Sequence, residues 1–365
     1  MSEIVLEGVT KRFGRVTAVD NVSFRAESGR FVVLLGPSGC GKSTVLRLIA
    51  GLEQPTAGRI LIDGNDVTGL APEKRRVSMV FQSYALFPHL SVAENIVFGL
   101  KVRRTADAER KKRLAAVVEL VGLTEQLERK PSQLSGGQRQ RVALARAVVA
   151  ENRICLMDEP LSNLDAQLRH GMRVELRALQ QRLGMTVVYV THDQVEAMSM
   201  ADKIVLIREG RIEQQGSPEA LYARPATIFA AKFIGTPAMN LVALSDGRDG
   251  ATIRGSASVV APGKNGAGLM LGVRPEHIRL QKGETGIPGT VTSAEYHGAD
   301  TIVTARVGEE TLLVRAPGQL ALAAGAPLRV SWDPEAAHLF DSATGSRVDA
   351  DQGARDARGQ HRKTG

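Results

Sequence analysis

The sequence predicts an α/β protein in which helices cover a mostly parallel sheet, with a small β domain after it. Short continuous apolar runs lie at 31–35, 153–158 and 186–190. They alternate with segments of helical periodicity, a pattern typical of parallel strands that are buried on both faces. Near Gly235 the composition shifts to Gly, Ala, Val and Thr with frequent turns, which predicts short antiparallel strands. A chain of 365 residues has room for both domains.

The elements of the first domain follow from the periodicity. Residues 1 to about 30 alternate apolar and polar side chains, which predicts an antiparallel subdomain. FVVLL at 31–35 predicts a buried strand that leads into a helix from 42 to about 50. From about 83 to 150 the periodicity is helical, so we expect a helical insertion. A helix between the last two apolar runs presents one apolar face, made of Leu168, Met172, Leu176, Leu179 and Leu183.

We therefore expect three segments. Residues 1–235 form the α/β domain, with its helical subdomain at about 83–150. Residues 236–345 form a small β domain, and the resemblance given below implies that it is a β-barrel of the OB-like kind. Residues 346–365 are polar and mixed in charge, which predicts a disordered tail.

Composition and charge exclude several classes of protein. The net charge of +8 could suit nucleic acid, but the densest basic run, KVRRTADAERKKR at 101–113, includes acidic residues and has no aromatics. A solvated helix face is the better interpretation, and a basic surface also suits the anionic cytoplasmic leaflet of a membrane. We expect no membrane span and no secretory signal. Cys40 and Cys155 fall in core elements, so we expect reduced thiols in a cytosolic protein.

The run GPSGCGKST has the residue types of a phosphate-binding loop. Three glycines allow backbone N–H groups to close around phosphate oxygens, a lysine reaches the β- and γ-phosphates, and a serine hydroxyl binds Mg²⁺. A plain strand-to-helix turn is the alternative, and the rarity of this spacing argues against it. The expected nucleotide-binding residues are Gly36, Pro37, Ser38, Gly39, Cys40, Gly41, Lys42, Ser43 and Thr44.

Polar residues follow three other apolar runs. Asp158 and Glu159 end ICLMDE, where the first would hold Mg²⁺ and the second would polarise the attacking water; a helix-capping pair is the alternative. His192 follows TVVYVT and could contact the γ-phosphate, although a histidine at such a position, taken alone, is more often a core or capping side chain. Gln82 follows VSMVF and could bind Mg²⁺ and water, although alone it is only a loop glutamine.

LSGGQRQR, at 134–141, begins a second candidate anion site. Its hydroxyl and its glycine N–H groups lie at a predicted helix N-terminus, where anions bind. One chain does not need two γ-phosphate sites for one nucleotide, so this site would act on a nucleotide held by another copy of the chain. The alternative is a helix that is simply capped by Ser135.

Together, GPSGCGKST, Gln82, LSGGQRQR, LMDEP, SNLD and His192 resemble the ordered motifs of ATP-binding cassette ATPases, over about 3–234. The resemblance implies a P-loop NTPase fold and a head-to-tail dimer that sandwiches ATP and Mg²⁺. It implies that Glu159 is the general base and that His192 contacts the γ-phosphate.

The same resemblance assigns roles to residues outside the phosphate loop. Ser135, Gly136, Gly137 and Gln138 would act on the nucleotide of the opposite chain. Asp165 of SNLD would lie at the dimer interface, and Phe13 would stack on adenine. Phe13 departs from the Trp or Tyr that many members carry.

The second domain resembles importer ATPases of the maltose and glycerol-phosphate type in LGVRPEHIRL, at 271–280. FIGTPAMNL, HGADT and HLFDSATGSRV are most similar to the branch that imports sn-glycerol-3-phosphate. The resemblance implies an ATPase on the cytoplasmic face of the inner membrane, with a second copy of itself, two transmembrane permease subunits and, indirectly, a periplasmic solute-binding protein as partners.

Other functions stay open at this point. The solute could be maltose or another sugar, or the cassette could serve export, translation or DNA repair. A nucleic-acid-binding β domain is a further alternative. One phosphate loop, no membrane span, no long heptad segment and only scattered aromatics favour an importer that binds no nucleic acid.

Overall fold

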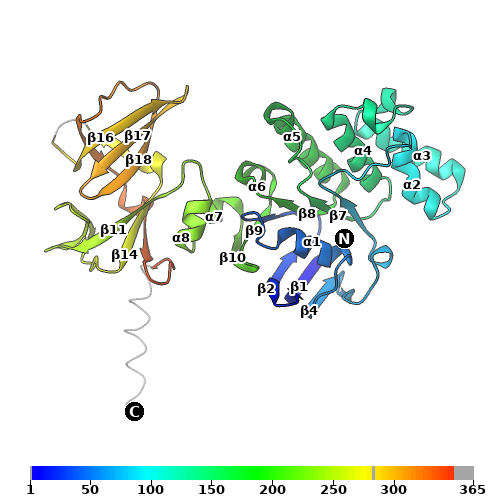
Figure 1. Ribbon diagram of the computed structural model, residues 1–365, viewed down its shortest axis with the longest axis horizontal. Helices are drawn as coiled ribbons and strands as arrows, with labels where there is room; N and C mark the ends of the chain where they lie inside the picture. The colour runs from blue at the N-terminus through cyan, green and yellow to red at the C-terminus, as the bar shows by residue number, and fades with distance from the viewer. Residues whose placement is uncertain (1, 282–283, 349–365) are drawn as a thin grey trace, which may run out of the picture. The chain divides into compact units, whose positions relative to one another are not determined.

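The computed structural model describes residues 2–281 and 284–348 (Figure 1). The chain divides into two compact units, Met1–Glu219 and Ala220–Gly365. This division comes earlier than the composition shift near Gly235, because α8 (Ile228–Phe233) belongs to the second unit. Ala231 of α8 packs in one apolar cluster with Met239 and Phe340.

The first unit contains an antiparallel sheet with the strand order β2-β1-β4-β5, as predicted for the start of the chain. Alternate side chains of β1 and β2 are buried, which is the pattern of a sheet with one covered face. The bounds are β1 Ile4–Phe13, β2 Val16–Ala26, β4 Ala57–Ile62 and β5 Asn65–Asp66.

The main sheet has the order β10-β9-β3-β8-β7-β6. Its strands are parallel except for β10, which pairs antiparallel with β9. One apolar cluster joins the antiparallel sheet, α1 (Lys42–Ala50) and the main sheet, and Figure 1 shows α1 between them. The bounds are β3 Phe31–Leu35, β6 Val77–Val80, β7 Ile154–Asp158, β8 Thr186–Thr191, β9 Lys203–Arg208 and β10 Arg211–Gly216.

Helices fill the rest of this unit. The described chain from 81 to 153 contains helices and no strand, which agrees with the predicted insertion. The apolar face predicted for α5 is buried at Met172, Leu176 and Leu179, but Leu183 at the end of the helix is 38% exposed. The bounds are α2 Val92–Val102, α3 Asp107–Leu120, α4 Gly136–Val148, α5 Ala166–Leu183 and α6 Gln194–Met200, with 3-10 turns at Pro72–Lys74, Thr124–Gln126 and Pro131–Gln133. The division between the two units falls within α7, Pro218–Ala223.

The second unit is the predicted small β domain. Two five-stranded antiparallel sheets, β13-β12-β11-β14-β20 and β15-β19-β16-β17-β18, share one apolar core. The bounds are β11 Asn240–Asp246, β12 Gly250–Ile253, β13 Val259–Pro262, β14 Leu269–Val273, β15 Arg279–Gln281, β16 Ile287–Tyr296, β17 Asp300–Val307, β18 Glu310–Pro317, β19 Pro327–Ser331 and β20 Ala337–Asp341.

The start of the expected tail is paired with this domain. Ser346 bridges Thr227, and Arg347 bridges Phe340. The N–H of Val348 donates to the carbonyl of Leu339. The rest of the expected disordered tail, 349–365, lies outside the described residues.

We expect His338 of β20 to make the stability of this domain sensitive to acid. Burial of the imidazole, with repulsion from Arg347 and Arg274, lowers the pKa of His338 to about 4, from an ordinary value of 6.5. Between these values the unfolded chain binds a proton that the folded domain does not, so stability falls as the pH drops through this range. Urea unfolding, followed by fluorescence of the single tryptophan, Trp332, should show this loss between about pH 6.5 and 4.

The matched variants are His338→Gln and His297→Gln. The first should flatten the dependence of the urea midpoint on pH, because it removes the buried titrating group. The second replaces a histidine whose side chain is 60% exposed and should leave the wild-type slope. An unchanged slope in His338→Gln would contradict this account.

Candidate active site

The predicted catalytic residues meet at one edge of the main sheet. The neighbouring strands β3, β8, β7 and β6 are parallel, so their carboxyl ends lie together. The phosphate loop follows β3, His192 follows β8, Glu159 follows β7, and Gln82 follows β6. The topology therefore brings together four segments that are far apart in the sequence.

Two glycines are required where the phosphate loop approaches other backbone. A Cβ on Gly36 would lie 2.2 Å from the carbonyl oxygen of Ile207, and one on Gly41 would lie 2.4 Å from that of Ala18. Gly41 also has a φ of 103° and caps α1, a conformation that side chains disfavour. The loop therefore tolerates no larger residue at either position, and it leads directly into the N-terminus of α1, where anions bind.

Lys42 holds the loop together from inside. Its ammonium donates to the carbonyl oxygens of Gly36, at 2.9 Å, and Pro37, at 2.8 Å, and the residue is 4% exposed. A positive charge thus lies within the ring of loop backbone, where a phosphate would need it.

Ser43 and Asp158 supply paired oxygens. The Ser43 hydroxyl donates to Asp158 Oδ1 at 2.7 Å, and Asp158 is 7% exposed at the end of β7. Among the described residues no group of three or more His, Cys, Asp or Glu could hold a metal. Mg²⁺ usually takes one or two protein oxygens together with substrate phosphates, so this donor set fits Mg²⁺ bound with a nucleotide.

Glu159 lies at the centre of the remaining contacts. Its Oε2 lies 3.2 Å from His192 Nδ1 and 3.4 Å from Gln82 Nε2. The backbone of Glu159 is left-handed, with a φ of 43°, and such strain persists only where neighbours hold it. Here the N–H donates to the carbonyl of Val190, at 3.1 Å, and the carbonyl accepts from the Ser162 hydroxyl, at 2.9 Å.

The residues after Glu159 also hold Gln82. Ser162 Oγ lies 3.4 Å from Gln82 Nε2, and the Asn163 amide donates to the carbonyl of Gln82 at 2.9 Å. Neither residue was singled out from the sequence, although both belong to the first half of the quoted SNLD motif.

LSGGQRQR begins α4 as a capped helix. The N–H of Gln138 donates to the Ser135 hydroxyl, and the Gln138 side-chain oxygen accepts from the N–H of Ser135, so both halves of a capping box are present. In the part of the chain that the structure describes, no hydrogen bond or ion pair joins 134–141 to the phosphate loop. The structure therefore groups this motif with the helical insertion and not with the phosphate loop of its own chain.

The segment that carries Asp165 packs against Gly136 and Gly137, the two glycines of LSGGQRQR, the signature segment. Asp165 caps α5, its carboxylate accepting from the N–H of Leu168 at 2.8 Å. A Cβ on Gly136 would lie 3.2 Å from Leu164 Cδ2, and one on Gly137 would lie 3.0 Å from Leu168 Cδ2. The starts of α4 and α5 are thus packed against each other.

Phe13 is an exposed aromatic beside the phosphate loop. Its ring is 48% exposed, and the Lys11 ammonium lies 4.7 Å from the ring centroid. Phe13 pairs with Val16 across the β1–β2 turn, two residues before Ala18, whose carbonyl contacts the loop at Gly41. The exposed ring is therefore accessible to a flat ligand.

Both cysteines are buried free thiols, as expected. Burial raises the pKa of the Cys40 thiol, and it raises that of Cys155 to about 12. Both side chains therefore stay protonated near neutral pH.

No helix among the described residues is long and apolar enough to span a membrane.

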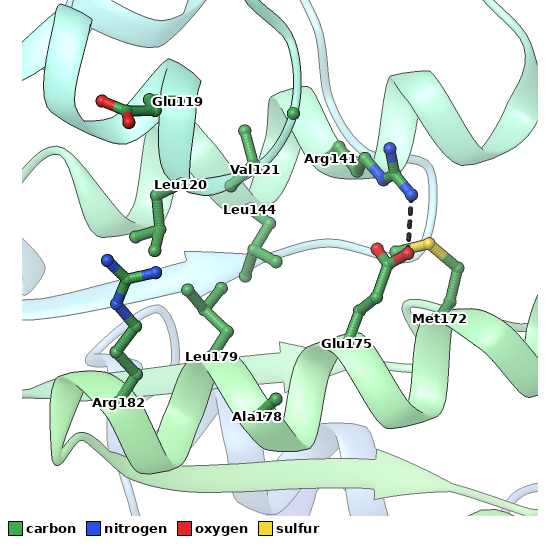
Figure 2. Close-up of a pocket in the computed structure, with 11 residues that line it drawn as sticks. Glu119, Leu120, Val121, Arg141, Leu144, Met172, Glu175, Ala178, Leu179 and Arg182 are labelled. Carbon is green, nitrogen blue, oxygen red and sulfur yellow. Dashed lines mark hydrogen bonds and ion pairs between the residues drawn. The ribbon is translucent and has the colours of Figure 1, made fainter.

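A cavity of about 410 Å³ lies away from this edge, between the helical insertion and α5. Figure 2 shows Leu144 of α4 and Leu179 of α5 pointing into it, and the ion pair of Arg141 with Glu175, at 2.7 Å, joining the two helices. The insertion is therefore not closely packed against the core along this seam.

Each of the two units contains a match to a known protein family. The family model described as ABC transporter matches residues 19–162, and the one described as TOBE domain matches residues 271–340. The second match covers most of the two-sheet β domain, in agreement with the expected OB-like barrel.

Curated relatives match almost the whole chain. An uncharacterised ABC transporter ATP-binding protein of Sinorhizobium fredii is 47% identical, over 95% of each chain. The sn-glycerol-3-phosphate import ATP-binding protein of Ruegeria pomeroyi is 44% identical, over 95% of this chain and 99% of its own. The protein with the same description from Salmonella choleraesuis is 46% identical, over 95% of this chain and 100% of its own.

A solved structure matches the first unit. It is a dimeric ATP-binding cassette in a post-hydrolysis state with ADP and Pi, 35% identical, with a TM-score of 0.53. The match covers 59% of this chain and 98% of the other. With the family matches, the relatives along the whole chain and the motifs that converge on one sheet edge, the chain belongs to the ATP-binding proteins of ABC transporters, and it is an ATPase.

Proposed function

We propose that this chain is the ATP-hydrolysing subunit of an ABC importer for sn-glycerol-3-phosphate, with Mg²⁺ as cofactor. The assignment of the solute rests on the sequence identity of 44–47%, along 95% of the chain, with import proteins of that description. In this proposal two copies form a dimer and act on two membrane permease subunits at the cytoplasmic face of the membrane. A periplasmic binding protein delivers the solute, and no nucleic acid takes part.

In this proposal the residues at the carboxyl ends of the parallel strands carry out ATP hydrolysis. Lys42 and the loop N–H groups bind the phosphates, and Phe13 stacks on the adenine. Ser43, Gln82 and Asp158 would hold Mg²⁺, which neutralises developing charge on the phosphates when bound. Glu159 accepts the proton of the attacking water and aligns it. His192, held 3.2 Å from Glu159, contacts the γ-phosphate.

The second copy completes each site. Ser135, Gly136, Gly137 and Gln138 present a helix N-terminus that has no γ-phosphate of its own chain to bind. The related cassette was solved as a dimer in a post-hydrolysis state with ADP and Pi, which supports hydrolysis within a dimer. Asp165, at the start of α5 beside the signature glycines, would meet the facing chain.

Gln82 connects hydrolysis to the helical insertion. Arg146 of α4 donates to the carbonyls of Tyr84, at 2.7 Å, and Ala85, at 2.6 Å. The buried side chain of Asn95 in α2 makes four hydrogen bonds to the backbone at Phe87, Leu90 and Ser91. A shift at Gln82 would therefore be carried into α2 and α4, on which we propose that the permeases act.

ATP hydrolysis in reconstituted vesicles tests which solute the transporter imports. The full chain, assembled with its candidate permeases, should hydrolyse ATP faster when a binding protein loaded with sn-glycerol-3-phosphate is enclosed. The same binding protein without solute, and a binding protein loaded with maltose, are the controls. Stimulation by maltose alone would replace the proposed solute with a sugar, and stimulation by neither would contradict the importer assignment.

A further inference from the structure

The His192 side chain is little restrained by its own contacts. It is 53% exposed, and its one polar contact among the described side chains is Glu159. The direction of the imidazole must therefore come from the backbone of the turn that carries it, at 191–193.

One hydroxyl ties the two ends of this turn. Thr191 Oγ1 donates to Glu196 Oε2 at 2.7 Å and accepts from the N–H of Asp193 at 3.0 Å. It thus joins the residue before His192 to the residue after it, and anchors both to α6.

The acceptor of that hydroxyl is deeply buried. Glu196 is 3% exposed, and the same Oε2 also accepts from the Tyr189 hydroxyl at 2.7 Å. Burial raises the pKa of Glu196, although both hydroxyl donors lower it. A buried carboxylate oxygen with two donors is a well-defined fixed point, because leaving either donor unpaired is costly.

Arg169 of α5 holds the turn from the other side. Its NH1 lies 3.5 Å from Asp193 Oδ2, and its NH2 donates to the carbonyl of Leu164 at 2.9 Å. A cavity of about 40 Å³ borders Arg169, Glu196, Glu159 and His192, and the Arg169 Nε is buried without a partner. The turn is therefore clamped beside the proposed reaction site.

We propose that Thr191 is a positioning residue, which through its bond to Glu196 holds His192 in the direction of Glu159. The inference rests on the proposed contact of His192 with the γ-phosphate. A capping role for Thr191 does not explain its bonds, since Asp193 already caps α6 by accepting from the N–H groups of Val195, at 2.7 Å, and Glu196, at 3.3 Å.

The test compares Thr191→Val, which keeps the side-chain shape and removes the hydroxyl, with Thr191→Ser, which keeps the hydroxyl. In steady-state ATP hydrolysis by the full chain, Thr191→Val should lower kcat by about 10- to 100-fold, the scale expected of a misplaced reacting group. The KM for ATP should change by less than about threefold, because the phosphate loop is untouched. Thr191→Ser should stay within about threefold of wild type in kcat.

Tyr189→Phe controls for a general effect on the buried carboxylate. It removes the other donor to Glu196 and leaves the turn bonded, so kcat should fall by less than about threefold. An equal loss in Tyr189→Phe and Thr191→Val would overturn the proposal, because the loss would then come from Glu196 and not from the turn.

A double-mutant cycle with His192→Ala decides whether Thr191 acts through His192. If it does, adding Thr191→Val to His192→Ala should lower kcat by less than about twofold. A full further loss would overturn the positioning role, as would a normal kcat of Thr191→Val in a wild-type background where His192→Ala is impaired. Normal turnover by His192→Ala would instead refute the role of His192 in the proposed function, and the positioning role with it.

Discussion

Replacing Glu159 by Gln should slow ATP hydrolysis by about 10²–10⁴-fold, equivalent to about 3–5 kcal/mol of barrier. The substitution keeps the size of the side chain and removes its ability to accept the proton of the attacking water. The backbone contacts of Glu159 with Val190 and Ser162 do not involve the carboxylate, so the strained turn should survive. ATP affinity should also survive, because in the proposed site Lys42 and the loop N–H groups bind the phosphates.

The measurement is single-turnover hydrolysis together with size-exclusion chromatography in ATP. The variant should accumulate as an ATP-bound dimer that wild type forms only transiently. Glu295→Gln is a matched control, because its side chain is 69% exposed in the β domain. Wild-type turnover in Glu159→Gln would remove Glu159 from the role of general base.

Replacing Ser135 by Arg should abolish hydrolysis while ATP still binds to the single chain. In the proposed dimer, a bulky cation at the start of α4 would block the approach of a second chain's nucleotide, whereas the phosphate loop lies elsewhere. The change also removes a helix cap, which costs about 0.5–2 kcal/mol. Ser91→Arg is the matched control, because Ser91 caps α2 with the same kind of capping box. It should lose similar stability and keep most of the ATPase activity.

A mixture of two inactive chains tests the shared site more directly. A Ser135→Arg chain paired with a Lys42→Ala chain retains one intact phosphate loop facing one intact signature. The mixture should hydrolyse ATP, although each variant alone does not. If the mixture is as inactive as its components, each chain does not depend on the signature of its partner in the way proposed here.

The sequence predicted the elements whose signal is local. The run at 31–35 is β3, and the helix expected from 42 to about 50 is α1 at Lys42–Ala50. Both rest on a short range of the chain: a continuous apolar run, and a glycine loop that ends at a helix. The small β domain was predictable for the same reason, from its turns and its composition.

What escaped prediction depends on contacts between distant segments. The composition shift near Gly235 marks only a local change in residue types. The division of the structure depends instead on the packing of α8 against Met239 and Phe340. The left-handed backbone of Glu159 and the clamp formed by Thr191 and Arg169 need the strand order, which no single segment carries. The roles of the site residues stay predictions, although the sheet brings Gln82, Glu159 and His192 together.

The tight fit of Gly136 and Gly137 against Leu164 and Leu168 has a mechanical consequence. A movement of either helix start would push against the other, so in the proposed dimer we expect the starts of α4 and α5 to move together. Binding of a nucleotide at one site of that dimer would then affect the opposite site through a joint tilt of these two helix starts.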